Sequence, residues 1–262
     1  MIRSPLGLRL DGARSVKEQV RAAASAGARG VVVDAAGDLG PDRLSETGRR
    51  EFRHALRSVE LNLIAMSLPT RRPFDSLDQI EDRLARADRA FALAYELGTR
   101  LVVARVGGLP PEADEGRRLA FTTALLELGT RADHRGVRFA IETGTEPGSV
   151  LGAYLDALAL PALAVSLDPS SLLRQGVDPV AATRELGGWV AHAYANDASK
   201  SSRTSILANP RGMGFPPGAL DWEEYLGALE EINYRGYLTV WPDPNGDASA
   251  QFKAIADRLR EF

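Results

Sequence analysis

Two carboxylates close neighbouring apolar segments of the chain. Glu142 ends the run Phe-Ala-Ile-Glu, and Asp168 ends the run Ala-Val-Ser-Leu-Asp. A charge at the end of a buried segment needs a partner, because burial of an unpaired charge is costly. Two such carboxylates can exchange protons with a substrate, hold a divalent metal ion together with water, or hydrolyse a glycosidic bond. The alternative is structural, an ion pair that closes one end of the fold.

The segments that carry these carboxylates belong to a regular alternation of strands and helices. Most of the predicted strands are near-continuous apolar runs, which is typical of parallel strands covered on both faces. The predicted strands are Leu6–Leu10, Gly30–Asp34, Leu61–Leu68, Leu101–Arg105, Val137–Glu142, Leu163–Asp168, Val190–Asn196 and Tyr237–Trp241. The predicted helices are a segment between Ser15 as N-cap and Gly27 as C-cap, then Ser45–Val59, Asp75–Leu97, Gly116–His134, Val150–Leu158, Pro179–Leu186, Trp222–Ile232 and Ala248–Leu259.

This alternation predicts an α/β protein with a parallel sheet. Eight strand–helix units in 262 residues favour a single (β/α)₈ TIM barrel over an open sheet, with residues 1–262 forming one domain. The first strand is not followed by G-x-G-x-x-G, which argues against a dinucleotide-binding fold.

The composition excludes several classes of function. The chain has 32 Lys+Arg against 35 Asp+Glu and a net charge of -3, which does not suit a surface that binds nucleic acid. The absence of cysteine excludes disulfides, thiolate metal sites and cysteine nucleophiles, and it fits the cytoplasm. No apolar run is long enough to span a membrane. We therefore expect a cytoplasmic protein without a nucleic-acid or membrane partner.

The active site of a (β/α)₈ barrel lies at the carboxyl ends of the strands. The residues that end the predicted strands are mostly polar or aromatic: Asp34, Ser67, Arg105, Glu142, Asp168, Tyr194 with Asn196 and Asp197, and Trp241 with Asp243. The long segment from Ser199 to Gly218 follows the seventh strand, and we expect it to be a functional loop. His192 is expected to be a core residue below Tyr194, whereas His54 and His134 fall on helix surfaces.

Several of these motifs resemble one known family. They are the runs Val137–Glu142, Ser166–Asp168 and Val190–Asp197, the Gly-Met-Gly at 212–214 with Leu-Asp-Trp at 220–222, and the ending Tyr234–Trp241. Together they resemble the xylose isomerase-like TIM barrels, which include sugar and sugar-phosphate isomerases and epimerases. The resemblance implies a divalent metal cofactor such as Mn²⁺, Mg²⁺ or Zn²⁺, with Glu142 and Asp168 as metal ligands and catalytic residues.

The chain departs from this family at the other two metal ligands. Tyr194 stands where the family has a ligand histidine, although His192 and Asp197 keep the rest of that motif. Trp241 stands in place of the final ligand glutamate, and Ser171 in place of a histidine that epimerases often use for substrate. Isomerisation through an enediol uses a metal ion to polarise the substrate, so the standard mechanism does not transfer intact.

The remaining candidates are substrate-binding residues. We hypothesise that Arg105 neutralises Glu142 in place of a metal ion. Tyr194 is a candidate hydrogen-bonding partner or acid, and Trp241 a stacking platform for a sugar ring, with pocket filling as the alternative for both. The resemblance adds Asp197 and, in the long loop, Arg211, which is a better candidate than Lys200 or Arg203.

These residues leave several functions open. The first is a sugar or sugar-phosphate isomerase or epimerase, with Glu142 as base and Asp168 orienting a sugar or sugar-acid substrate. The second is a non-catalytic or metal-independent carbohydrate-binding member of the same family. Metal-free hydrolysis by the two carboxylates is a third. An endonuclease IV type nuclease is rejected, because its zinc site needs several histidines and the chain has only three. The resemblance also implies a homo-oligomer.

Overall fold

The computed structural model describes residues 4–10, 15–197, 220–243 and 245–262, and it confirms the predicted TIM barrel. The strands form a closed barrel in which each pairs in parallel with the next, and β1 pairs with β8. The strands are β1 Leu6–Arg9, β2 Gly30–Asp34, β3 Asn62–Ser67, β4 Leu101–Ala104, β5 Arg138–Glu142, β6 Leu163–Leu167, β7 Val190–Tyr194 and β8 Leu238–Val240.

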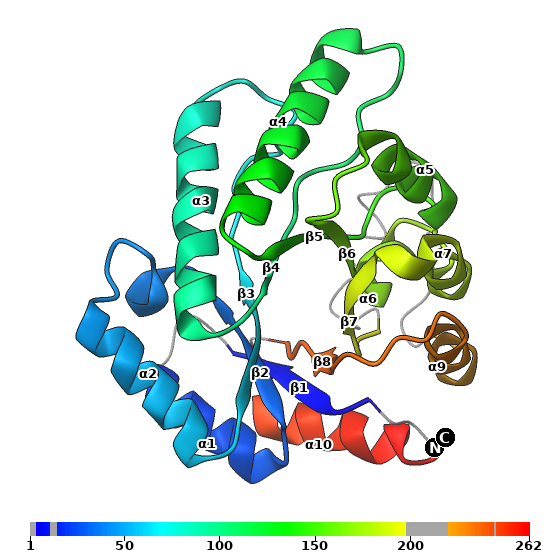
Figure 1. Ribbon diagram of the computed structural model, residues 1–262. Coiled ribbons are helices and arrows are strands. Elements are labelled where there is room, and N and C mark those ends of the chain that lie inside the picture. Colours follow the sequence, from blue (N-terminus) through cyan, green and yellow to red (C-terminus); the bar gives the residue numbers. More distant parts are fainter. Residues whose placement is uncertain (1–3, 11–14, 198–219, 244) are drawn as a thin grey trace.

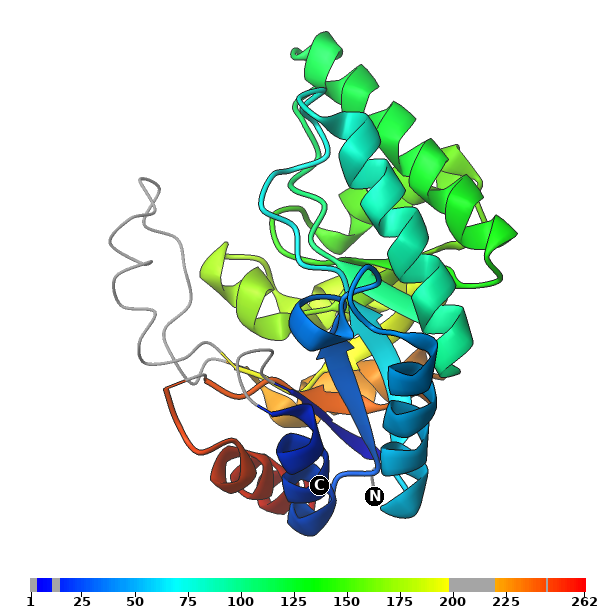
Figure 2. The ribbon, with the colours of Figure 1, turned by 90° about the vertical axis from the view of Figure 1, so that its left-hand side faces the viewer.

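Helices surround the ring of strands (Figure 1). The two longest, α3 and α4, lie side by side on one flank, and α1 and α10 lie together on another (Figure 2). The helices are α1 Val16–Ala26, α2 Glu46–Ser58, α3 Ile80–Leu97, α4 Glu115–His134, α5 Gly148–Leu158, α6 Pro169–Arg174, α7 Pro179–Leu186, α9 Trp222–Glu231 and α10 Ala248–Leu259, with 3-10 turns η1 Gly37–Leu39 and η2 Gly187–Trp189. None of the helices in the described ranges is long and apolar enough to cross a membrane.

The predicted helix ends are confirmed in part. Gly27 and Gly98 end α1 and α3 in the left-handed conformation, each with φ of 99°, which glycine adopts without strain. Ser15 occupies the N-cap position of α1, but its side chain makes no capping hydrogen bond. The predicted start of a helix at Asp75 is wrong, because α3 begins at Ile80 and the buried carboxylate of Asp75 pairs instead with Arg117 on α4.

Glycines and other small residues line the interior of the barrel around the side chain of Ile64. A Cβ atom added to Gly7 or Gly30 would collide with the side chain of Ile64, which crosses the interior. A layer of small apolar residues surrounds Ile64: Val32, Ala65, Val103, Ala140 and Ala164. Strand side chains alternate between the two faces of the barrel wall, so the next inward position on each strand lies one layer closer to the carboxyl ends.

Candidate functional site

A layer of polar and aromatic side chains lies at the carboxyl ends of the barrel strands, and each strand contributes one residue to it. Most are connected by hydrogen bonds or ion pairs, and the set includes the predicted residues Glu142, Asp168, Arg105, Tyr194 and Trp241. In chain order the layer is Arg9, Asp34, Ser67, Arg105, Glu142, Asp168, Tyr194 and Trp241. The fold thus brings together side chains that are far apart in the sequence.

Arg9 lies at the centre of this layer. Its Nη1 donates to the Tyr194 hydroxyl (2.7 Å) and to Glu142 Oε1 (3.3 Å). Its Nη2 donates to the Ser67 hydroxyl (2.7 Å) and to Asp34 Oδ1 (3.0 Å). The side chain is 10% exposed. Burial lowers the pKa of Arg9, but Tyr194, Glu142 and Asp34 outweigh this effect and raise it, so the guanidinium stays charged.

Arg105 bridges the two predicted catalytic carboxylates from the solvent side. Its Nε donates to Glu142 Oε2 and its Nη2 to Asp168 Oδ2, both at 3.1 Å. The Arg105 side chain is 52% exposed, whereas those of Glu142 and Asp168 are 3% and 1% exposed. The predicted contact between Arg105 and Glu142 is therefore present, and Asp168 shares the same guanidinium.

Tyr194 is a buried hydrogen-bonding residue of the layer. Its hydroxyl donates to Glu142 Oε1 (3.0 Å) and accepts from Arg9. Burial, followed by the negative charge of Glu142, raises the pKa of Tyr194 well above its usual value. The phenol is consequently neutral at physiological pH, and its hydroxyl contacts both Arg9 and Glu142, which also contact each other.

Trp241 covers the charged layer. Its ring lies 3.8 Å from the Arg9 guanidinium carbon and 5.5 Å from that of Arg105, within the range of cation–π attraction. The ring also packs 5.1 Å from that of Tyr194. Trp241 remains partly exposed and lines the cavities at the mouth of the barrel.

His192 lies one layer deeper, which confirms its prediction as a core residue. Its Nδ1 is hydrogen-bonded to the Ser166 hydroxyl (2.8 Å) and its Nε2 to the Thr239 hydroxyl (2.9 Å). Burial, and then the charge of Arg9, lowers the pKa of His192 to about 3. The imidazole is neutral and both nitrogens are occupied. His54 and His134 are exposed, as predicted.

Asp168 also organises the start of α6. Its Oδ1 accepts from Asn196 Nδ2 and from the backbone N–H of Ser171, both at 3.1 Å, and thereby caps the helix. Asp197 is partly buried and its carboxylate accepts from the backbone N–H of Leu220 (3.3 Å). The predicted substrate residue Arg211, with Lys200 and Arg203, lies outside the described residues.

A cavity of about 530 Å³ opens at this end of the barrel. Its walls include Arg105, Asp168 and Trp241 from the layer and Asn196, Asp197 and Arg174 beyond it. A second cavity of about 570 Å³ is also lined by Trp241, together with Arg9 and Asp34. Both have the size of cavities that hold small organic ligands.

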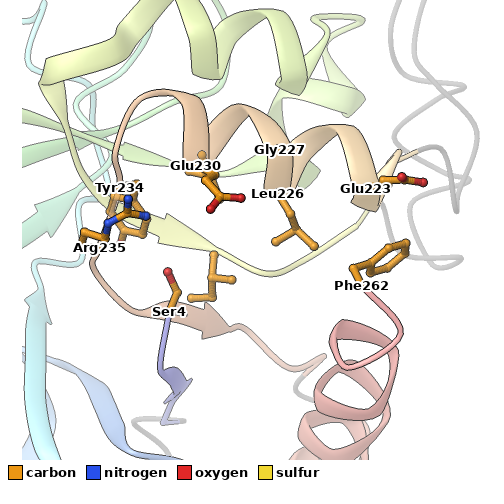
Figure 3. Close-up of a pocket in the computed structure, with 10 residues that line it drawn as sticks. Ser4, Glu223, Leu226, Gly227, Glu230, Tyr234, Arg235 and Phe262 are labelled. Atoms are coloured by element: carbon orange, nitrogen blue, oxygen red, sulfur yellow. The ribbon is translucent and has the colours of Figure 1, made fainter. Parts of the chain in front are cut away.

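Another pocket lies away from the charged layer, beside α9 and the amino-terminal side of β1 and β8. Figure 3 shows Ser4, Leu226 and Tyr234 around it. Its volume is about 170 Å³, and its charged residues Glu223, Glu230 and Arg235 are exposed. Unlike the charged layer, this pocket has no buried charged side chain among its lining residues.

The carboxylate oxygens of Glu142 and Asp168 accept hydrogen bonds from neighbouring donors. Each of the four oxygens of Glu142 and Asp168 accepts at least one hydrogen bond from a side chain or backbone group. Among residues 4–10, 15–197, 220–243 and 245–262, no group of three or more histidine, aspartate and glutamate side chains is placed to hold a metal ion.

Arg9 was not among the site residues predicted from the sequence. Its signal is a single arginine in the apolar run Leu-Gly-Leu-Arg-Leu, on the same strand face as Gly7. Such a charge inside a predicted barrel strand implies buried acidic partners. Arg174, on the unpredicted helix α6, was also missed.

Comparisons with known proteins agree with this architecture. Residues 20–262 match the family model of the xylose isomerase-like TIM barrel. A xylose isomerase domain protein from Planctomyces limnophilus has a similar structure, with a TM-score of 0.80 and 18% identity, covering 98% of this chain and 96% of its own. No curated protein matches the sequence.

Two further structures illustrate the range of activities on this fold. A D-psicose 3-epimerase from Clostridium cellulolyticum H10 superposes with a TM-score of 0.76 at 15% identity, covering 98% of each chain. A probable 3-DHS dehydratase from Bacillus anthracis superposes with a TM-score of 0.75 at 18% identity, again covering 98% of each chain. At these identities the likeness shows the fold alone. By its family match and its closed barrel, the chain belongs to the xylose isomerase-like TIM barrel family.

Proposed function

We propose that the protein binds a small sugar or sugar acid in the 530 Å³ cavity at the carboxyl ends of the strands, without a divalent metal ion. The single observation that carries the proposal is the position of Arg105. Its guanidinium lies between Glu142 and Asp168 and pairs with both at 3.1 Å. A positive charge thus occupies the place between the carboxylates where a metal ion would be held.

The surrounding groups support this reading. Arg9 adds a second guanidinium on the buried side of Glu142. A divalent cation would be repelled by both arginines and would have to displace their hydrogen bonds, while Tyr194 is neutral and Trp241 has no ligating atom. The residues present therefore do not fit a metal ion.

The site retains groups that suit a polyhydroxylated ligand. A carboxylate oxygen can accept two hydrogen bonds, and Oε2 of Glu142 and Oδ2 of Asp168 each accept only the one from Arg105 among the described residues. Each can accept a further bond from a ligand hydroxyl. The exposed part of Trp241 offers an apolar face for a sugar ring. Asn196 supplies an amide at the same wall.

The proposal is tested by metal analysis and ligand binding on the purified protein. Plasma mass spectrometry should find no stoichiometric metal, and Mn²⁺, Mg²⁺ and Zn²⁺ should leave the melting temperature unchanged. Saturation-transfer NMR with a panel of aldoses, ketoses and sugar acids should detect binding that persists in EDTA. A stoichiometric metal that is lost in Glu142→Ala would overturn the metal-independent site.

A matched pair of variants isolates the bridging arginine. Arg105→Ala should weaken ligand binding, because it removes the cation between Glu142 and Asp168. Arg135→Ala is the control, since Arg135 is 46% exposed and pairs with Asp88 away from the barrel mouth. If Arg105→Ala behaves like Arg135→Ala in ligand binding and in stability, Arg105 does not play the proposed role.

A second candidate is an isomerase or epimerase, favoured by the unused acceptor position on Glu142 beside Arg105. Glu142 Oε2 would take a proton from the carbon next to a substrate carbonyl, and Arg105 would donate a hydrogen bond to the carbonyl oxygen as negative charge develops there. Incubation with ketoses and aldoses in D₂O should then place deuterium on that carbon, and Glu142→Gln should abolish the exchange. Binding without exchange would identify a non-catalytic member. Glycosidic hydrolysis is less suited, because its two carboxyl groups must flank the scissile bond and Arg105 lies between Glu142 and Asp168.

A further inference from the structure

Arg174 is a second cation in the wall of the 530 Å³ cavity. It ends α6, the short helix capped by Asp168, and its Nη1 donates to the Ser170 hydroxyl. No ion pair joins it to any residue in the described part of the chain. Burial lowers the pKa of Arg174, the charge of Arg105 lowers it further, and Asp168 partly compensates. The guanidinium is thus a partly buried positive charge beside a second one.

Arg105 contributes an unused donor to the same cavity. Its Nε and Nη2 are engaged by Glu142 and Asp168, but its Nη1 donates to no residue that the structure describes. Both arginines line the cavity wall, and Arg105 is half exposed toward it. Two like charges in one cavity repel each other, and an anionic group between them would relieve that repulsion.

We propose that Arg105 and Arg174 form a subsite for a carboxylate, so that the ligand of this barrel is a sugar acid rather than a neutral sugar. This inference rests on the proposed function, because it assigns the chemical class of the ligand in the same cavity. Glu142 and Asp168 already pair with Arg105, whereas Arg174 pairs with no carboxylate in the described part of the chain. Asp197 and Asp243 add negative charge to the same cavity, so a ligand with one negative charge is favoured over a ligand with two. A carboxylate supplies one negative charge and matches the planar guanidinium edge, whereas a doubly charged phosphate would add an excess charge beside Asp168.

The rest of the cavity suits the hydroxylated end of such a ligand. Asp197 and Asp243 lie on the walls contributed by the segments after β7 and β8, where they disfavour an anion but can accept from hydroxyl groups. Asp243 Oδ1 already accepts from the backbone and side chain of Asn245 (2.9 and 3.1 Å). The cavity therefore has a cationic side and an acidic side, and a sugar acid complements both.

The test compares matched pairs of ligands that differ in charge. The probes are D-gluconate with D-glucitol, D-glucuronate with D-glucose, and D-galacturonate with D-galactose, measured by saturation-transfer NMR and calorimetry. We expect at least one acid to bind about tenfold or more tightly than its neutral partner, since hydrogen bonds to charged groups contribute more than neutral ones. Equal affinities within each pair would overturn the carboxylate subsite while leaving the proposed function intact. Absence of binding by both members of every pair would overturn the proposed function and this inference together.

Variants of Arg174 separate binding from a structural role. Arg174→Gln should abolish the preference for the acid while leaving the affinity of the neutral partner within about twofold. Arg174→Lys keeps the charge without the planar edge and should retain part of the preference. Arg184→Gln, on the outer helix α7, is the control and should change neither affinity. If Arg174→Gln weakens acid and neutral ligand equally, Arg174 acts through the structure of α6 and the subsite is refuted.

Discussion

Replacement of Arg9 by methionine tests whether one guanidinium ties the carboxyl ends of the strands together. Arg9 donates to groups on β2, β3, β5 and β7, and its ion pair with Glu142 joins side chains that are only 10% and 3% exposed. Methionine has a similar length but donates no hydrogen bond. Breaking a buried ion pair by removal of one partner costs about 3–5 kcal/mol. Arg105 still pairs with Glu142, and Asp34 is 25% exposed and can be solvated, so we expect a loss near the lower limit.

The assay is equilibrium unfolding in urea at neutral pH, followed by circular dichroism. The control is Arg50→Met on α2, where an exposed ion pair of 3.7 Å with Glu46 should contribute little. In the double variant Arg9→Met/Glu142→Gln the unpaired charge is absent, so the two effects should not add. If Arg9→Met lowers the free energy of unfolding no more than Arg50→Met, or if the effects of Arg9→Met and Glu142→Gln are additive, the buried ion pair of Arg9 does not stabilise the barrel as expected.

Three further predictions concern the barrel interior. Because burial lowers the pKa of His192 to about 3, its contribution to stability is present above the unfolded pKa of 6.5 and is lost as the pH falls toward 3. Between neutral pH and pH 5 the free energy of unfolding should fall by about 2 kcal/mol from this cause. In urea titrations the free energy of unfolding of His192→Asn should decline less steeply with falling pH, and an equally steep decline would contradict the prediction. Gly7→Ala should destabilise the barrel by about 1–3 kcal/mol through its clash with Ile64, and Ile64→Val should restore part of the loss; calorimetric melting of the single and double variants checks this. Tyr194→Phe removes the hydrogen bond to Glu142 Oε1 and should cost about 1–3 kcal/mol of unfolding free energy without shifting the circular dichroism spectrum; an unchanged urea midpoint would count against that bond.

The periodic parts of the fold were predictable because each element carries its own signal. The apolar runs ending at Asp34 and Glu142 are strands with the predicted bounds or close to them, and Gly98 ends α3 as expected. Helix starts were harder to predict. The segment after Asp75 continues the helical period, yet the helix begins at Ile80 since a tertiary ion pair with Arg117 holds Asp75 outside it.

The residues of the candidate site were predictable where a strand ends in a polar residue, but not where they are identified only by partners distant in the sequence. Glu142, Asp168 and Arg105 were found from their positions at strand ends, and the structure joins them. Arg9 was missed because its partners lie 25 to 185 residues away in sequence, so that no local pattern reveals them. Arg174 was missed for a different reason: six residues of α6 are too few for a visible helical period.

The long sequence separations around Arg9 have a consequence for how the barrel folds. The guanidinium belongs to β1, but Glu142 and Tyr194 follow it by 133 and 185 residues. While only the early strands are in place, Arg9 must remain hydrated, because burying it without those partners would be costly. Its burial therefore requires β5 and β7, and contacts of such separation form slowly. The charged layer therefore forms late in folding, together with closure of the barrel. Protection of Arg9 from solvent would report that β5 and β7 have joined the barrel.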